Sequence, residues 1–268
     1  MVINSTFMKA GAWAHVRACK NGVKKMLSDR DLFLMSILEK VTLANTRQLM
    51  ILGGYRDPSV IRKRINKLKS QGYIESGWIG DHLGYTLSQS GLYELEKNRK
   101  PYEIKGIKSE HEELVTEAAC WIYVRSQRSI MEMYFDHELN SKAQFKNTGH
   151  KPDIVFSKHQ ALEVELSSKS TASYGNKSRL EENFKTNANN YGRQTWVIPK
   201  RKEGLRNRLV QLAEKYNVEK YFTVISVEDL ISHVEAYDVS VNCPRTEPVI
   251  AVPSPIVREK KEIWKELK

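Results

Sequence analysis

Cysteine is scarce in this 268-residue sequence, and its three residues lie far apart in the chain: Cys19, Cys120 and Cys243. Such spacing supports neither a disulfide framework nor a zinc site built on a Cys-x-x-Cys pair. Long apolar runs are also missing, since none approaches the roughly 20 residues that a membrane-spanning helix needs. The first residues do not read as a signal peptide, because Lys9 and Arg17 interrupt their most apolar stretch. We therefore expect a cytoplasmic protein with no membrane partner.

Several common enzyme motifs are absent as well. The sequence contains no GxxxxGKS/T phosphate-binding loop, no GxGxxG dinucleotide fingerprint, no HExxH zinc motif and no histidine-hydrophobic-histidine metal triad. What is present is the composition of a folded protein, with 40% hydrophobic and 28% charged residues. The length suggests about two domains.

Basic charge is concentrated in the first third of the chain. Of the net charge of +11, residues 1–100 contribute +9, from 17 Lys and Arg against 8 Asp and Glu, and the remaining residues contribute +2. A basic segment ahead of a nearly neutral one is typical of a chain whose first part binds a polyanion such as nucleic acid. A basic surface that serves only solubility is the alternative.

The pattern of residues 29–72 predicts three helices. Asp29 is a candidate cap for the first, whose apolar residues recur at helical spacing, and a second short helix fits residues 45–52. Asp57 and Pro58 supply the cap and the first helical residue of the third helix.

Residues 73–97 predict a β-hairpin and a closing helix that Ser88 caps. Three helices followed by a hairpin resemble the winged helix-turn-helix domain, and the resemblance covers residues 29–97. It implies that the third helix enters the major groove of duplex DNA, while the hairpin loop at 80–84 reaches the minor groove or the backbone. The basic residues expected to contact DNA lie on this helix or just before it: Arg56, Arg62, Lys63, Arg64, Lys67 and Lys69.

The second part of the chain predicts an α/β domain at residues 109–240, after a polar linker at 98–108. Helices and strands alternate in the order α-β-β-β-α-β-α-β, which favours an α/β sandwich around a mixed sheet. The expected elements are helices at 109–126, 178–191 and 203–216 and strands at 130–135, 154–156, 161–166, 195–198 and 221–225. An N-terminal extension at 1–28 and a Pro-rich tail with a terminal helix at 241–268 complete this two-domain α/β organisation.

The most informative side chains are acidic and lie on two neighbouring predicted strands. Asp153 starts one strand, and Glu163 and Glu165 alternate with apolar residues on the next. Alternate residues share a face of a strand, so the two glutamates point the same way, and a hairpin would set Asp153 beside Glu163. Buried carboxylates are costly unless they are paired or bind a cation, and Mg²⁺ or Mn²⁺ prefers such oxygen ligands. The alternative is the solvated face of an edge strand.

Pro152-Asp153 followed by Glu163-Val164-Glu165, in this order of helices and strands, resembles the PD-(D/E)xK nuclease superfamily over roughly residues 109–226. The resemblance implies a restriction-endonuclease-like sandwich and metal-dependent cleavage of a phosphodiester. It assigns Asp153, Glu163 and Glu165 to the catalytic site and to a Mg²⁺ or Mn²⁺ ion. The superfamily usually has lysine where Glu165 stands, so Lys169 is the expected catalytic lysine and Lys177 the alternative.

His111 lies on the same predicted helix face as Val115, Ala118 and Ile122. The first helix of this superfamily often contributes an acidic or histidine side chain, which implies a catalytic role for His111 in metal binding or proton transfer. A hydrogen-bonded histidine without a catalytic role is the alternative. Glu112 is expected to face away from this stripe.

A winged helix followed by a nuclease-like domain resembles the MOBC-type plasmid mobilisation relaxases and the related replication-relaxation family. That resemblance implies a relaxase that nicks one strand of double-stranded DNA at a plasmid origin of transfer, with other relaxosome proteins or a coupling protein as further partners. Two alternatives stay open. One is another endonuclease of this superfamily, from a transposon or a defence system. The other is a winged-helix regulator of plasmid replication or transcription that does not cleave.

Overall fold

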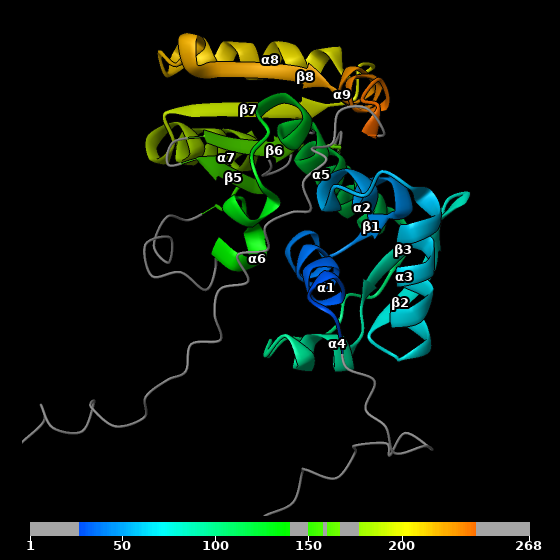
Figure 1. The fold of residues 1–268 in the computed structure, drawn as a ribbon. Coiled ribbons are helices and arrows are strands. Elements are labelled where there is room, and N and C mark those ends of the chain that lie inside the picture. Colours follow the sequence, from blue (N-terminus) through cyan, green and yellow to red (C-terminus); the bar gives the residue numbers. More distant parts are fainter. Residues whose placement is uncertain (1–26, 140–149, 158–159, 167–176, 240–268) are drawn as a thin grey trace, which may run out of the picture.

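The computed structural model describes residues 27–139, 150–157, 160–166 and 177–239. They form a mixed α/β structure with two separate sheets, one of three strands and one of five (Figure 1). The long helix α5 (Gly106–Ser126) lies between the two parts. No helix in these residues is both long and apolar enough to cross a membrane.

The N-terminal part packs four helices against the three-stranded sheet, whose strands are antiparallel in the order β1-β3-β2. Its elements are α1 (Asp29–Val41), β1 (Ala44–Asn45), α2 (Thr46–Gly53), α3 (Pro58–Ser70), β2 (Ile74–Ile79), β3 (His82–Leu87) and α4 (Gln89–Glu94).

Short polar side chains begin these helices. Asp57 accepts a hydrogen bond from the Ser59 amide and precedes Pro58, so α3 starts where the sequence predicts. Ser88 caps α4, as expected. The cap of α1 is Ser28 rather than Asp29, because the Ser28 hydroxyl accepts the amide hydrogen of Asp31, whose carboxylate accepts the Ser28 amide in return.

The C-terminal part is built on the five-stranded sheet β4-β5-β6-β7-β8. Strands β4, β5 and β6 are antiparallel neighbours, and β6, β7 and β8 run parallel. The strands are β4 (Tyr134–Phe135), β5 (Ile154–Ser157), β6 (Gln160–Val164), β7 (Arg193–Ile198) and β8 (Phe222–Ser226). The helices after α5 are α6 (Asp136–Leu139), α7 (Lys177–Asn190), α8 (Glu203–Lys215) and α9 (Val227–Glu235), with 3-10 turns at Ile130–Glu132 and Glu219–Tyr221.

Helices cover both faces of this sheet (Figure 1). Leu162 and Val164 of β6 pack into a core shared with α5 and α9. Trp196 and Ile198 of β7 pack on the other face against apolar residues of α7 and α8. Glu163 lies between Leu162 and Val164, so its side chain points to the α7 face.

Three details of the expected elements are wrong. Residues 130–135 form a 3-10 turn and a two-residue strand instead of one longer strand. Strand β6 ends at Val164, before Leu166, and α9 was not expected at all. The expected terminal helix in 257–268 lies outside the described residues.

The two parts share one continuous hydrophobic core. Its buried side chains run from α1 and α2 through Ala118, Ala119 and Ile122 of α5 to Leu230 and Val234 of α9. The expected linker at 98–108 therefore does not separate independent bodies, because α5 packs on both sheets and begins inside that segment, at Gly106.

Candidate active site

Strands β5 and β6 bring Asp153 and Glu163 to neighbouring positions. Ile154 pairs with Leu162 in the antiparallel register, which places the preceding Asp153 beside Glu163, with both side chains on the same side of the sheet. Burial raises the pKa of Asp153 well above its usual value, and the Glu163 carboxylate raises it further. Burial, together with Glu165, likewise raises the pKa of Glu163. Two carboxylates at this spacing disfavour full ionisation of the pair.

His111 and the end of β6 hold Asp153. Its Oδ2 atom accepts the amide hydrogen of Val164 at 2.7 Å. The Nε2 atom of His111 lies 3.8 Å from the same oxygen and 3.1 Å from the carbonyl oxygen of Val164. Helix α5 thus brings His111 to the carboxylates, as the helical spacing predicts.

Glu163 is 7% exposed and is contacted by His150, which precedes β5. The His150 Nε2 atom lies 2.9 and 3.0 Å from the two carboxylate oxygens of Glu163. Burial lowers the pKa of His150. Glu165 follows β6, and its amide donates to the Val197 carbonyl at 2.9 Å, which extends the pairing with β7 by one residue.

Asn187 on α7 adds a buried polar side chain that the sequence pattern did not single out, and Tyr191, directly after this helix, adds a second. Asn187 is fully buried, and neither its amide nitrogen nor its amide oxygen has a hydrogen bond of normal geometry among the described residues. The side chain is nevertheless close enough to Glu163 to lower its pKa. The buried hydroxyl of Tyr191 has no described partner either. Burial and then the Glu163 charge raise the pKa of Tyr191 to about 12.

A sequence signal for this pair was available. Leu180, Phe184 and Asn187 recur at helical spacing and form the buried stripe of α7, and Tyr191 continues this spacing directly after the helix. An asparagine within an apolar stripe is costly unless it meets a polar partner, and here the stripe faces Glu163.

Two further acids lie around the pair or beside its neighbours. Asp136 at the start of α6 raises the pKa of both Asp153 and Glu163. Burial raises the pKa of Glu112, and the charge of Asp136 raises it further. The site therefore carries several acids in a small volume.

The described residues do not form a ready three-ligand metal site. No group of three or more His, Cys, Asp or Glu side chains among them is arranged to hold a metal ion. The expected catalytic residue Lys169 lies outside the described residues, and so does the side chain of its alternative, Lys177.

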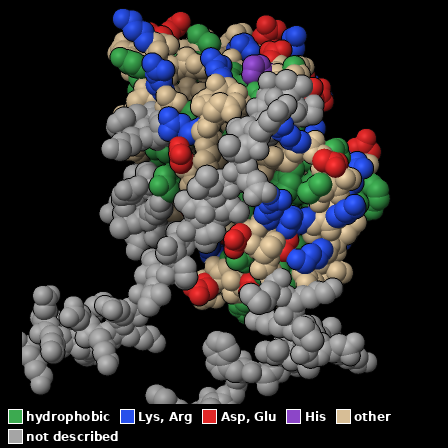
Figure 2. Space-filling view, viewed as in Figure 1, with side chains coloured by type: hydrophobic (Ala, Val, Ile, Leu, Met, Phe, Trp, Pro, Cys, Tyr) green, Lys and Arg blue, Asp and Glu red, His purple; other side chains and the backbone are tan. Residues whose placement is uncertain are grey.

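The predicted DNA-contacting residues differ in their exposure and in their partners. Arg62 and Lys63 are exposed on α3. Arg64 and Lys67 instead form ion pairs with the buried carboxylate of Asp31 on α1, at 2.6 and 2.5 Å. The remaining two are half-buried: Lys69, which donates to the Ser76 hydroxyl, and Arg56. Lys and Arg side chains gather over α3 in Figure 2.

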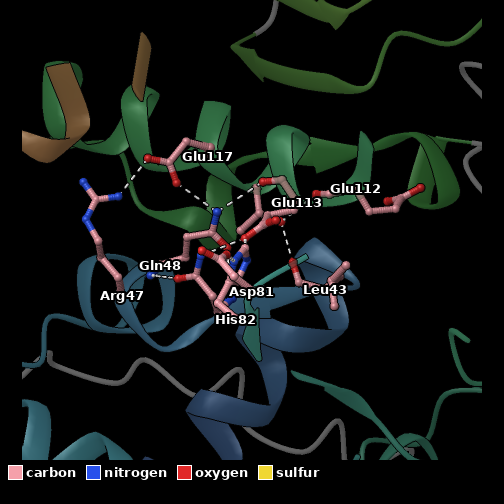
Figure 3. Close-up of polar contacts among 10 residues, drawn as sticks. Leu43, Arg47, Gln48, Asp81, His82, Glu112, Glu113 and Glu117 are labelled. Atoms are coloured by element: carbon pink, nitrogen blue, oxygen red, sulfur yellow. Dashed lines mark hydrogen bonds and ion pairs between the residues drawn. The ribbon is translucent and has the colours of Figure 1, made fainter. Parts of the chain in front are cut away.

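The hairpin formed by β2 and β3 contacts α5. His82, next to the turn, contacts Glu113 through Nε2 at 2.5 Å and Asp81 through Nδ1 at 3.0 Å (Figure 3). The loop that was expected to reach DNA is therefore tied to the C-terminal part through this histidine.

Comparisons with protein-family models, with curated proteins and with solved structures gave no match for this chain.

Proposed function

We propose that this protein is a metal-dependent endonuclease that nicks one strand of duplex DNA at a plasmid origin of transfer, as a relaxase in conjugative mobilisation. The observation that carries the proposal is the pair Asp153, directly before β5, and Glu163 on β6, which lie side by side with both pKa values raised. Perturbed carboxylates gathered in one place are characteristic of a reacting site.

The arrangement of the sheet supports a PD-(D/E)xK assignment. An antiparallel run of three strands carries the carboxylates, and two parallel strands follow, with α5 on one face and α7 on the other. The N-terminal helices and hairpin support the winged-helix assignment, because the exposed face of α3 presents Arg62 and Lys63.

The carboxylates fit a magnesium or manganese ion. Magnesium is commonly bound through only one or two carboxylates, while water and substrate phosphate complete its shell, so a three-ligand cluster is not required. Asp153 and Glu163 would hold the ion, and Glu165, two residues after Glu163, is the next candidate ligand. Such an ion lowers the pKa of a bound water and stabilises the charge on the leaving oxygen.

Residues of the protein orient the metal-binding carboxylate and provide positive charge for the DNA. The Val164 amide and His111 orient the Asp153 carboxylate. Arg62 and Lys63 on α3 hold the duplex through its phosphates. Glu165 stands where the superfamily usually has a lysine, so Lys169 is proposed to support the water or the phosphate.

Supercoiled plasmid incubated with the protein and Mg²⁺ tests the enzyme directly. We expect conversion to open circles by the wild type and loss of this activity in Asp153→Asn and Glu163→Gln. Glu214→Gln, which removes an exposed charge from α8, is the matched control and should cleave normally. Tight duplex binding without any cleavage by the wild type would instead favour the regulator of replication or transcription.

The cleavage map separates a relaxase from other endonucleases of the superfamily. We expect one nick on one strand near an origin of transfer. Paired breaks on both strands would contradict mobilisation and favour a transposon or defence enzyme.

A further inference from the structure

A recess lies at the N-terminal ends of the parallel strands, whereas Glu163 lies near the C-terminal end of β6. It has a volume of about 420 Å³ and lies between the last turns of α5 and the first residues of β6, β7 and β8. This volume is in the range of pockets that hold small ligands. Along α5, Arg125 in the recess is 14 residues from His111, a separation of about 20 Å at 1.5 Å per residue. The recess is therefore distinct from the carboxylate site.

The charge of the recess is uniformly positive. Arg125, Arg193 and Lys220 line it from three different elements, and none of its lining residues in the described part of the chain is acidic. All three are exposed, and none forms an ion pair with a carboxylate within the described parts of the chain. Three converging cations without acidic partners favour an anionic ligand.

Aromatic side chains lie beside these cations. Trp121 forms part of the wall, and the Arg125 guanidinium lies 5.2 Å from the centre of its ring. Tyr221 also lines the recess and is 53% exposed, so part of its ring is open to a ligand. Thr195 and Thr223 on the parallel strands add hydroxyl groups that can donate or accept hydrogen bonds.

We propose that this recess binds a nucleotide unit, with its base against Tyr221 and its phosphate among Arg125, Arg193 and Lys220. Aromatic faces stack on bases of any sequence, and lysine and arginine neutralise the adjacent phosphates. The unit is either a free nucleotide or one nucleotide of a single DNA strand, and the same chemistry recognises both. The site is independent of the proposed cleavage chemistry, because it uses none of the carboxylate residues.

Fluorescence anisotropy with a labelled thymidine octanucleotide tests this site on the full chain. We expect the triple variant Arg125→Gln, Arg193→Gln, Lys220→Gln to bind at least about ten-fold more weakly. The plot of log affinity against log salt concentration should become less steep by about 2. This is the loss expected for three cations, since each phosphate contact on a single strand contributes about 0.7 to the slope. Tyr221→Ala should weaken binding roughly five-fold or more, whereas Tyr221→Phe should bind as the wild type does, because the stacking face is kept.

A matched pair of variants separates this site from α3. Arg62→Gln with Lys63→Gln should weaken binding of a duplex and spare the octanucleotide, and the triple variant should do the reverse. Asp153→Asn should bind the octanucleotide normally, so loss of cleavage and loss of this site are distinguishable.

Competition experiments show whether the ligand is a free nucleotide or a nucleotide within a DNA strand. Displacement by thymidine monophosphate assigns the site to free nucleotides, and displacement only by unlabelled octanucleotide assigns it to a single strand. The proposal is overturned if the triple variant keeps wild-type affinity, or if an abasic octanucleotide or tripolyphosphate binds as tightly as the thymidine strand. The substituted side chains are exposed, and circular dichroism verifies that each variant is folded.

Discussion

The carboxylates of this protein differ in their neighbours, and we expect them to affect its stability in opposite directions. Asp153 and Glu163 are acids whose charged forms are disfavoured by burial and by each other. Asp31 is also fully buried, yet it is surrounded by the cations of Arg64 and Lys67 and by Ser28. A buried carboxylate with cationic partners holds the fold together, whereas one beside another acid is retained at a cost in stability, as functional residues often are.

The first prediction follows from this contrast. Asp153→Asn and Glu163→Gln remove a charge from the acidic pair while keeping its shape, so we expect each variant to be at least as stable as the wild type at pH 7. The expected gain is up to about 1–2 kcal/mol. Chemical denaturation measures it. A loss of 2 kcal/mol or more in both variants would contradict the account of a repulsive pair.

Asp31 gives the second prediction, which concerns pH. Burial acts against ionisation of Asp31, but hydrogen bonds from Lys67, Ser28 and Arg64 outweigh it and lower its pKa to about 2. Because the pKa in the folded state is the lower one, the stabilisation is present above the unfolded value of about 3.9 and is lost as pH falls through 2.

We expect Asp31→Asn to lower the free energy of unfolding at pH 6 by about 2–4 kcal/mol, since it leaves two cations without their buried partner. The deficit relative to wild type should shrink between pH 4 and pH 2. Urea denaturation of both proteins across that range measures it, and a deficit independent of pH would count against the ion pairs.

Among the elements, α3 most clearly separates residues that pack on the rest of the protein from residues that are exposed. Its apolar stripe of Ile61, Ile65 and Leu68 packs into the core. Arg64 and Lys67 turn toward α1, so the surface left for a duplex is carried by Arg62 and Lys63.

The third prediction tests that division. Arg62→Ala and Lys63→Ala should each weaken duplex binding by about 1–3 kcal/mol if the side chain contacts a base, and should reduce the salt dependence if it contacts only phosphate. Both variants should keep wild-type stability. Arg64→Ala, in contrast, should lower stability because it releases Asp31. Unchanged duplex binding in both exposed variants would remove α3 from the interface.

Elements with local signals were predictable from the sequence. Asp57 and Pro58 mark the start of α3, and Ser88 marks that of α4, because caps act within a few residues. The strand after residue 160 was predicted too long, since its apolar alternation continues to Leu166 although strand β6 ends at Val164. Helix α9 was missed because no turn residue separates it from β8, although Ser226 and its bond from the Asp229 amide cap it.

The candidate site was predictable only where it depends on a local register. A short hairpin sets Asp153 beside Glu163, and helical spacing sets His111 on the inner face of α5. Asn187 and Asp136 reach the same place through the docking of α7 and α6 on the sheet. That docking depends on tertiary packing, which a pattern within one segment does not encode.

At the scale of the whole molecule, α5 connects the N-terminal part, which we propose to bind DNA, with the part that carries Asp153 and Glu163. On the side toward the N-terminal part, Glu117 bonds Arg47 and Gln48, and Glu113 bonds Asn45 and His82 (Figure 3). The apolar side of the same helix packs under the five-stranded sheet. The position of α3 relative to the proposed cleavage site therefore depends on α5, which packs on α2, the neighbour of α3, and on β5 and β6.

The fourth prediction is that the two parts unfold together. Because the core is continuous, calorimetry should give one transition. Glu117→Ala leaves buried polar groups on Gln48 and Arg47 unpaired, so it should lower the stability of that single transition by about 1–3 kcal/mol. Glu110→Ala, on the exposed side of α5, is the matched control and should have little effect. Two separate transitions, of which only one responds to Glu117→Ala, would mean that the parts are independent.

Direct titration of Mn²⁺ into the full chain, followed by electron paramagnetic resonance of the free ion, is the most direct test of the central claim that Asp153 and Glu163 share a divalent cation. We predict specific Mn²⁺ binding to the wild type in the presence of duplex DNA. We predict its loss in the double variant Asp153→Asn, Glu163→Gln, while Glu214→Gln binds normally. Equal Mn²⁺ binding by all three proteins, or none by the wild type, would contradict the account.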